Sequence, residues 1–246
     1  MEFLSDVVRW FGGPANWSGA SGIPARTLEH VWYSGLSVVI AAAVALPLGL
    51  VIGHTRRFEL LIVSIANLWR ALPSFAVLFF AFVVFLRLGF GAFTIWPTIV
   101  AMVFLAIPPI LTNTYVGIQQ VDADTVEAAR GMGMTGWDVL RRIEMPLAAG
   151  LIVTGLRIAA VQVVATATLG AVVGAGGLGR FIIDGFAAGK DEQIFGGAVL
   201  VAVLAILTEV GFGALARVAR PRGVGSPRAA LRHPARAGRP DGEVAV

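Results

Sequence analysis

The chain of 246 residues has no cysteine, only three histidines and few charged side chains. Without cysteine, disulfide scaffolds, thiolate zinc sites and cysteine nucleophiles are excluded. The histidines are scattered, at positions 30, 54 and 233, so we expect neither a metal site nor a cofactor. Charged residues make up 14% of the chain, against roughly 25% in soluble domains, while 57% are hydrophobic. A water-soluble fold of this size could not bury so much apolar surface, and the composition therefore indicates an integral membrane protein.

Positive charge is concentrated near the C-terminal end of the chain. Residues 217–246 hold seven arginines and two acidic residues, a net charge of +5, whereas the whole chain carries +4. The remaining body is therefore close to neutral. We expect 218–246, which is rich in arginine and proline, to be a disordered tail beside anionic membrane lipid. This pattern does not favour nucleic acid as a partner.

The apolar runs predict about five membrane-spanning helices. Each needs about 20 apolar residues to cross about 30 Å of hydrocarbon. An interfacial half-helix is expected over 60–69, because Arg70 and Pro73 interrupt the second apolar stretch. The predicted spans are residues 31–53, 71–88, 95–117, 147–173 and 194–216.

The arginines predict the orientation of these spans, because positively charged flanks stay in the cytoplasm. With five spans, the tail, Arg56 with Arg57, and the loop 118–146 all fall on one side, which we take as cytoplasmic. The N-terminal segment 1–27 and the loop 175–193 then lie outside. A sixth span over 59–70 would place Arg56 and the tail on opposite sides of the membrane.

The loop 118–146, which we call the coupling segment, is longer than a connection between neighbouring spans requires. We expect Asp124 to cap a first short helix and Thr135 to cap a second. Gly133 is expected to adopt the left-handed conformation between them, and Pro146 suits the first turn of the next span. The pattern thus predicts a helix, a glycine break, a second helix and a span. On pattern alone, an amphipathic connector on the membrane surface would also explain it.

The coupling segment also resembles a known family motif. The matching residues follow the EAA pattern of ATP-binding-cassette importer permeases: Glu127, Ala128, Ala129, Gly133, Ile143 and Pro146. Met145 replaces the leucine that this motif usually carries. The similarity extends over about residues 28–217, and residues 113–118 and 155–159 are most similar to the glycine betaine, carnitine and choline permeases.

This resemblance implies an all-α integral membrane fold, the transmembrane domain of a type I importer related to methionine permeases. It also implies a bacterial cell membrane location, multi-pass, with the N-terminus outside and the C-terminus in the cytoplasm. The implied partners are an ATPase dimer, a second identical or different permease subunit, an extracytoplasmic substrate-binding protein and membrane lipid. The chain would then be a non-catalytic subunit, in which the segment from Glu127 to Gly133 transmits closure of the ATPases to the spans.

A glycine-rich stretch after the fourth predicted span matches the dinucleotide-binding pattern GxGxxG. Its glycines are Gly174, Gly176, Gly177 and Gly179. Because the dinucleotide fingerprint requires a preceding strand, we interpret the stretch instead as a flexible turn at the outer mouth. The phosphate-binding pattern GxxxxGK[ST] does not occur, so energy from ATP would have to come from a partner.

Two charges, Arg157 and Glu209, lie well inside predicted spans, where an unpaired charge is costly. We expect a structural ion pair between the fourth and fifth spans, with a gating or pathway role as the alternative.

Three functions stay open at this point. The first is ATP-driven import of quaternary-ammonium osmoprotectants, and the second is a methionine-type permease. The third, from a different class, is a self-sufficient channel or ion-coupled carrier, which the coupling segment and the scarcity of intramembrane carboxylates disfavour. An intramembrane enzyme lacks candidate residues, since the chain has no HExxH pattern and no paired intramembrane acids.

The absence of cysteine makes the topology directly testable. Single cysteines introduced within 18–25 or 184–190 should react with an impermeant thiol reagent in intact cells, because these segments are expected outside. Cysteines within 122–142 or 225–246 should react only after permeabilisation. Labelling of Asp138→Cys from outside would contradict the five-span arrangement.

Overall fold

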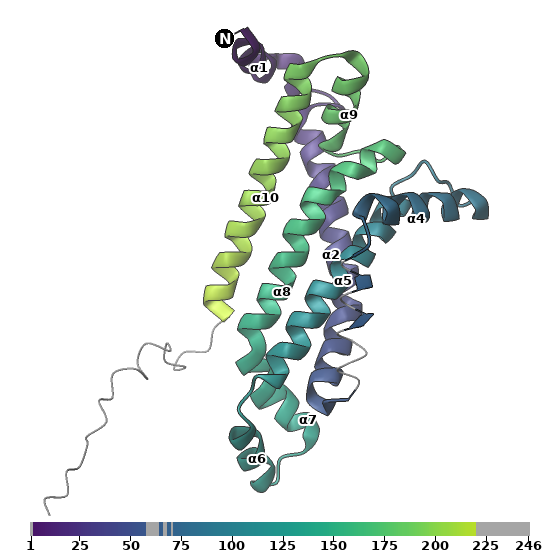
Figure 1. Cartoon of the computed structure of the whole chain (residues 1–246). Helices are drawn as coiled ribbons and strands as arrows, with labels where there is room; N and C mark the ends of the chain where they lie inside the picture. The colour runs from purple at the N-terminus through teal and green to yellow at the C-terminus, as the bar shows by residue number, and fades with distance from the viewer. Residues whose placement is uncertain (1, 58–63, 66–67, 70, 220–246) are drawn as a thin grey trace, which may run out of the picture.

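A computed structural model describes residues 2–57, 64–65, 68–69 and 71–219, and the elements within these ranges are all helical (Figure 1). The long helices are α2 (Ile23–Thr55), α5 (Trp96–Gln119), α8 (Met145–Thr166) and α10 (Asp191–Ala219). Bilayers favour this architecture because a helix satisfies its own backbone hydrogen bonds where water is absent.

Helix α5 occupies the centre of the bundle, between α2 and α8. It is the most buried of the four long helices in the described ranges. Small residues let its neighbours approach closely. A Cβ atom added at Gly49 of α2 would lie 2.7 Å from the Thr114 Cβ, and one added at Gly155 of α8 would lie 2.7 Å from the Asn113 Cβ. Van der Waals contact between closely approaching helices is a main source of association in membranes.

The helix bounds differ from the predicted spans in three places. Helix α2 begins at Ile23, eight residues before the predicted start of the first span, and Pro24 stands in its first turn, where proline is tolerated. The fourth predicted span corresponds to α8 followed by a 3-10 segment, η3 (Ala167–Val173). The second, predicted over 71–88, is the shorter helix α4 (Ser74–Leu88).

Helix α4 has 15 residues. At about 1.5 Å per residue it is shorter than the hydrocarbon thickness, whereas four other helices in the described ranges are long and apolar enough to cross. Pro73 stands at its N-terminal boundary, because proline lacks the N–H needed further inside a helix. In Figure 1, α4 extends sideways from the bundle. Leu78 and Ala81 anchor it against Ala101 of α5 and Val173.

The N-terminal segment contains a helix that the sequence analysis did not predict, α1 (Glu2–Gly12), followed by a short 3-10 turn, η1 (Pro14–Trp17). Helix α1 packs on α10, and the rings of Trp10 and Phe181 meet edge to face. Phe181 belongs to α9 (Gly179–Ala188). These elements gather at one end of the molecule (Figure 1).

Two predictions fall mainly on residues outside the described ranges. Helix α10 ends at Ala219, so the predicted tail lies outside them from residue 220 onward. Most of the half-helix expected over 60–69 lies outside them too, as does Arg70.

Candidate functional site

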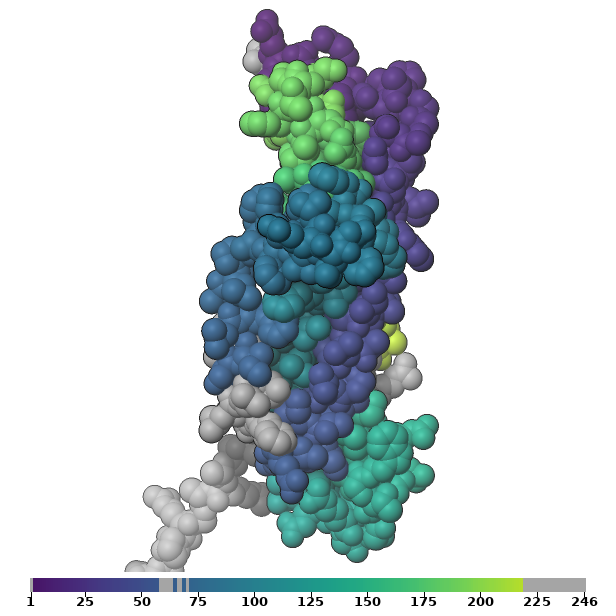
Figure 2. Space-filling view, turned by 90° about the vertical axis from the view of Figure 1, so that its right-hand side faces the viewer, coloured from purple at the N-terminus to yellow at the C-terminus, as the bar shows by residue number. Residues whose placement is uncertain are grey.

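The coupling segment forms a separate helical unit at one end of the bundle. It contains α6 (Ala123–Gly131), α7 (Gly136–Val139) and a π-helical turn, η2 (Leu140–Glu144), that runs directly into α8. The unit lies at the opposite end of the molecule from α1 and α9 (Figure 1). Figure 2 shows the same separation on the surface, with the coupling segment protruding at the bottom and the N-terminal region at the top.

Side chains define both helix starts. The Asp122 carboxylate accepts hydrogen bonds from the Asp124 N–H at 3.3 Å and from the Thr125 hydroxyl at 3.2 Å. The expected cap, Asp124, is therefore wrong by two residues, although its charge still lies at the favourable end of the helix dipole. Thr135 caps α7 as expected: its hydroxyl oxygen accepts from the Asp138 N–H at 3.2 Å and its O–H donates to the Asp138 carboxylate at 2.6 Å.

Gly133 connects the two helices in the expected left-handed conformation, with φ of +84°. Apart from the glycine and its two chain neighbours, no atom of the described residues lies within 4 Å of the position its Cβ would occupy. A side chain here would therefore meet no steric obstacle, and the constraint is the backbone conformation alone.

The surface of the coupling segment combines charge with exposed apolar side chains. Glu127 and Ala128 are exposed, whereas Ala129 is 2% exposed. Met132 is 77% exposed and Trp137 is 66% exposed. Large apolar side chains exposed together are typical of a partner contact. Trp137 was not identified from the sequence, although an indole two residues after a helix cap in a polar loop was an available signal.

The last two motif residues belong to the start of the following span. Ile143 is half-buried in η2, and Pro146 stands in the first turn of α8, as expected. The motif therefore extends from the exposed helix α6 into the bundle itself.

A second connection joins the coupling segment to α2. Glu144 is 5% exposed, and its Oε2 lies 2.6 Å from the Nδ1 of His54 in the last turn of α2. The other ring nitrogen, Nε2, lies 3.4 Å from the position a Cβ would occupy at Gly136. This pair was not expected from the sequence, because the two residues are 90 positions apart and belong to no shared motif.

The structure brings Arg157 of α8 and Glu209 of α10 together. The Arg157 Nε donates to Glu209 Oε2 at 2.7 Å, and its Nη2 donates to Oε1. This two-point geometry is the strongest that a guanidinium and a carboxylate form. The contact joins α10 to the rest of the bundle between two membrane-spanning helices.

The glycine-rich loop lies at the other end of the molecule, close to α2. Gly174 and Gly177 have φ of +91° and +81°. A Cβ at Gly176 would collide with the Glu29 carboxylate, and one at Gly179 would collide with the backbone of Thr168. Glycine is thus required here for packing as well as for conformation.

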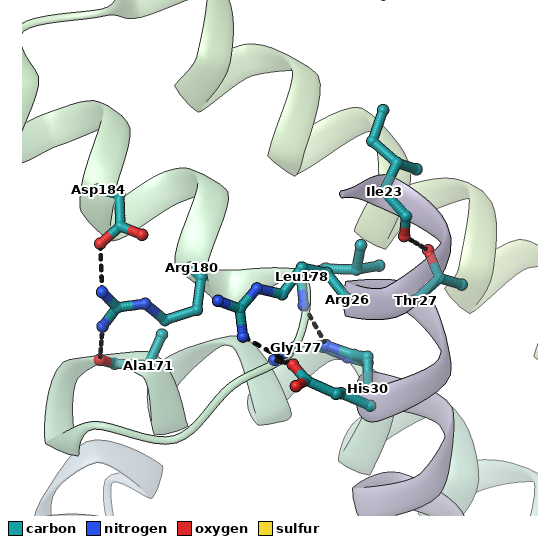
Figure 3. A network of polar contacts seen from close by, with 10 residues as sticks. Ile23, Arg26, Thr27, His30, Ala171, Gly177, Leu178, Arg180 and Asp184 are labelled. Atoms are coloured by element: carbon teal, nitrogen blue, oxygen red, sulfur yellow. Dashed lines mark hydrogen bonds and ion pairs between the residues drawn. The ribbon is translucent and has the colours of Figure 1, made fainter. Parts of the chain in front are cut away.

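Hydrogen bonds hold this loop against α2 (Figure 3). The Gly177 N–H donates to Glu29 at 2.8 Å, and the Leu178 N–H donates to the His30 Nδ1 at 3.2 Å. Because Nδ1 accepts, the proton is on Nε2, which lies 2.9 Å from the Val164 carbonyl oxygen and donates to it. The loop that was expected to be a flexible turn is thus hydrogen-bonded to α2, and through His30 to α8. No strand precedes it within the described ranges.

These features define a helical membrane protein with a protruding helical unit at one end. Residues 45–222 match the family described as binding-protein-dependent transport system inner membrane component. The chain belongs to this family, as the motif indicated.

Named relatives support a narrower similarity. The chain is 38% identical to the glycine betaine/carnitine/choline transport system permease protein OpuCB of Bacillus subtilis, over 81% of this chain and 89% of that one. It is 39% identical to the carnitine transport permease protein OpuCD of Listeria monocytogenes, over 78% and 84%. The structure resembles the inward-facing MetNI methionine transporter with a TM-score of 0.71 at 21% identity, covering 81% of this chain and 96% of that one. The predicted methionine-permease-like fold is confirmed.

Neutralising Arg157 and Glu209 tests the energetic role of their contact. Arg157→Met and Glu209→Gln should each lower stability more than the double variant does, because a single change leaves an unpaired charge in a poorly solvating environment. We expect a coupling energy of about 0.5–3 kcal/mol in a double-mutant cycle, measured by thermal unfolding of the purified complex. The exposed pair Arg9–Asp6 serves as the control and should show almost no coupling. Additive effects of the two changes would show that the contact contributes nothing.

Proposed function

We propose that the chain is the pore-forming permease subunit of an ATP-driven importer for quaternary-ammonium osmoprotectants such as glycine betaine, carnitine and choline. The observation that carries this proposal is that relatives 35–39% identical over about four fifths of the chain are permeases named for these compounds. A quaternary amine cannot lose its charge, so it requires a protein path across the hydrocarbon.

The coupling segment is the proposed docking surface for the ATPase partner. Its protruding position and exposed Glu127, Met132 and Trp137 support this role. ATP binding and hydrolysis would then take place entirely in the partner, and this chain would hold no cofactor of its own.

Motion at the coupling segment can be passed on by two rigid connections. The first is the uninterrupted helical path from α7 through η2 into α8. The second is the His54–Glu144 hydrogen bond, which links the same turn to α2. Pulling on α6 and α7 would therefore displace α8 and α2 together, as alternating access requires.

The two ends of the molecule offer sites for the other proposed partners. A substrate-binding protein would dock at the end formed by α1, α9 and the glycine-rich loop, and a second permease subunit, identical or different, would complete the path. We place the N-terminus outside and the C-terminus in the cytoplasm. The coupling segment and Arg56, the arginine that caps α2, support this orientation by lying at the same end.

Competition for uptake tests the substrate. Vesicles that contain the permease, its ATPase and its binding protein should accumulate labelled glycine betaine when ATP is supplied. Excess choline, carnitine or proline betaine should inhibit this uptake, and excess methionine should not. Saturable methionine uptake without any response to betaines would contradict the osmoprotectant assignment and leave the permease assignment intact.

Substitutions in the coupling segment test its mechanical role. Gly133→Val should abolish uptake while the subunit still inserts, because a β-branched residue at φ of +84° is strained by about 1–2 kcal/mol. Glu127→Lys should do the same by reversing charge at the partner contact. Gly211→Val is the matched control, since Gly211 also has open space around it, has an ordinary φ and lies in α10, outside the coupling segment. Normal uptake by Gly133→Val, or equal loss in Gly211→Val, would remove the coupling role.

A further inference from the structure

A cavity of about 380 Å³ lies between α5, α8 and the chain that leads into α4. This volume falls within the range of small-molecule sites. Its lining combines aliphatic side chains with polar residues, an indole and two prolines. The polar residues, the indole and the prolines are Trp69, Ser74, Pro108, Pro109, Gln162 and Thr166.

Several polar groups of this lining have no partner. The Trp69 Nε1–H is shielded from solvent and meets no acceptor among the described residues. Buried polar groups are normally satisfied, and in a membrane an unsatisfied group such as this N–H is especially costly. The side chains of Ser74, which is half-buried, and Gln162, which is exposed, also form no hydrogen bond within the described residues. Hydrogen-bond donors are therefore available to a ligand.

Acceptors are available from the backbone of α5. Pro108 and Pro109 lack an N–H, so the carbonyl groups of Phe104 and Leu105 lose their usual helical donors. Such carbonyls carry partial negative charge, and Leu105 and the two prolines belong to the cavity wall. The ring of Trp69 packs on Phe104 with centroids 3.9 Å apart, which fixes an aromatic surface beside them.

None of the described residues that line the cavity carries a charged side chain. A ligand with net charge would therefore be desolvated without a counter-ion, at high cost. A zwitterion can be bound by neutral groups. Hydrogen-bond donors can bind its carboxylate, and carbonyl oxygens together with an aromatic ring can bind its trimethylammonium group. The cavity offers both.

We propose that this cavity is a transmembrane binding site for small zwitterionic quaternary amines, in which Trp69, Ser74 and Gln162 donate to the carboxylate. The proposal rests on the proposed function, and it adds a selection step within the permease itself. The site favours net-neutral glycine betaine over cationic choline, because the two share the trimethylammonium group and differ in the carboxylate.

Saturation-transfer NMR of the N-methyl protons tests the site directly. The permease–ATPase complex in lipid nanodiscs, without binding protein, should transfer more magnetisation to glycine betaine than to choline. Gln162→Glu should shift the betaine-to-choline ratio by about tenfold toward choline, because the new carboxylate repels the ligand carboxylate and attracts the cation. Partial misfolding would lower both signals alike. An unchanged ratio in a variant that retains the summed wild-type signal, or no transfer to betaine in the wild type, would overturn the proposal.

Two threonines of α8 provide a matched control. Thr166 and Thr154 each donate to the carbonyl four residues earlier, at 2.7 and 2.8 Å, but only Thr166 lines the cavity. Thr166→Val should lower betaine saturation several-fold, while Thr154→Val should retain the wild-type signal. An equal loss of betaine signal in both variants would show that the substitutions act on the stability of α8, and would contradict the proposed site.

Betaine uptake with the binding protein present separates this proposal from the proposed function. Normal wild-type uptake without saturation transfer would overturn the cavity site alone. Uptake of methionine in place of betaine would overturn the proposed function.

Discussion

The close approach of α5 to α2 and α8 is the contact on which the rest of the structure depends. Lipid provides little hydrophobic drive for helices to associate, so they must gain contact energy by fitting closely. Gly49, Gly53 and Gly155 allow that fit, because at each of them a Cβ would lie 2.7 Å from a side-chain carbon of α5. With α5 held between its neighbours, α4 and η3 pack on its N-terminal half. The cavity and the coupling segment are both positioned by this arrangement.

The same bundle keeps two polar ends apart. At one end, His30 and Glu29 of α2 hold the glycine-rich loop by accepting backbone N–H bonds. At the other, His54 of α2 meets the buried Glu144 of η2. Helix α2 therefore connects both ends by side-chain hydrogen bonds, and a shift of one end relative to the other must move or break them.

Some connections between the helices are continuous or paired, and another runs through a single glycine. The path from α7 into α8 is continuous helix, and the ion pair of Arg157 with Glu209 adds α10 to it. By contrast, α6 is joined to α7 through a left-handed glycine with open space around it. In the proposed coupling, force applied to α6 would reorient it locally while the pull is passed on through α7. Of the unpaired polar groups near Pro108 and Pro109, Trp69 precedes α4, Ser74 begins α4 and Gln162 belongs to α8.

The sequence by itself determined the membrane class, the all-helical fold and the coupling motif, because hydrophobic run length, arginine placement and residue spacing are local properties. It also placed Thr135 as a cap and Gly133 as a left-handed residue, since both depend on a few neighbouring positions. The shortness of α4, the helix α1 and the true cap Asp122 depend on how the chain packs and turns, which periodicity does not specify.

Only the tertiary structure decided which distant side chains meet. The pairing of His54 with Glu144, the anchoring of the glycine-rich loop by His30, and the cavity between α5 and α8 join residues far apart in the chain. Arg157 and Glu209 could be proposed as partners because an isolated intramembrane charge needs one, but their two-point contact required the packing of α10 on α8. A sequence pattern can show that a charged or polar side chain requires a partner. Which side chain becomes that partner is decided by how closely the helices pack.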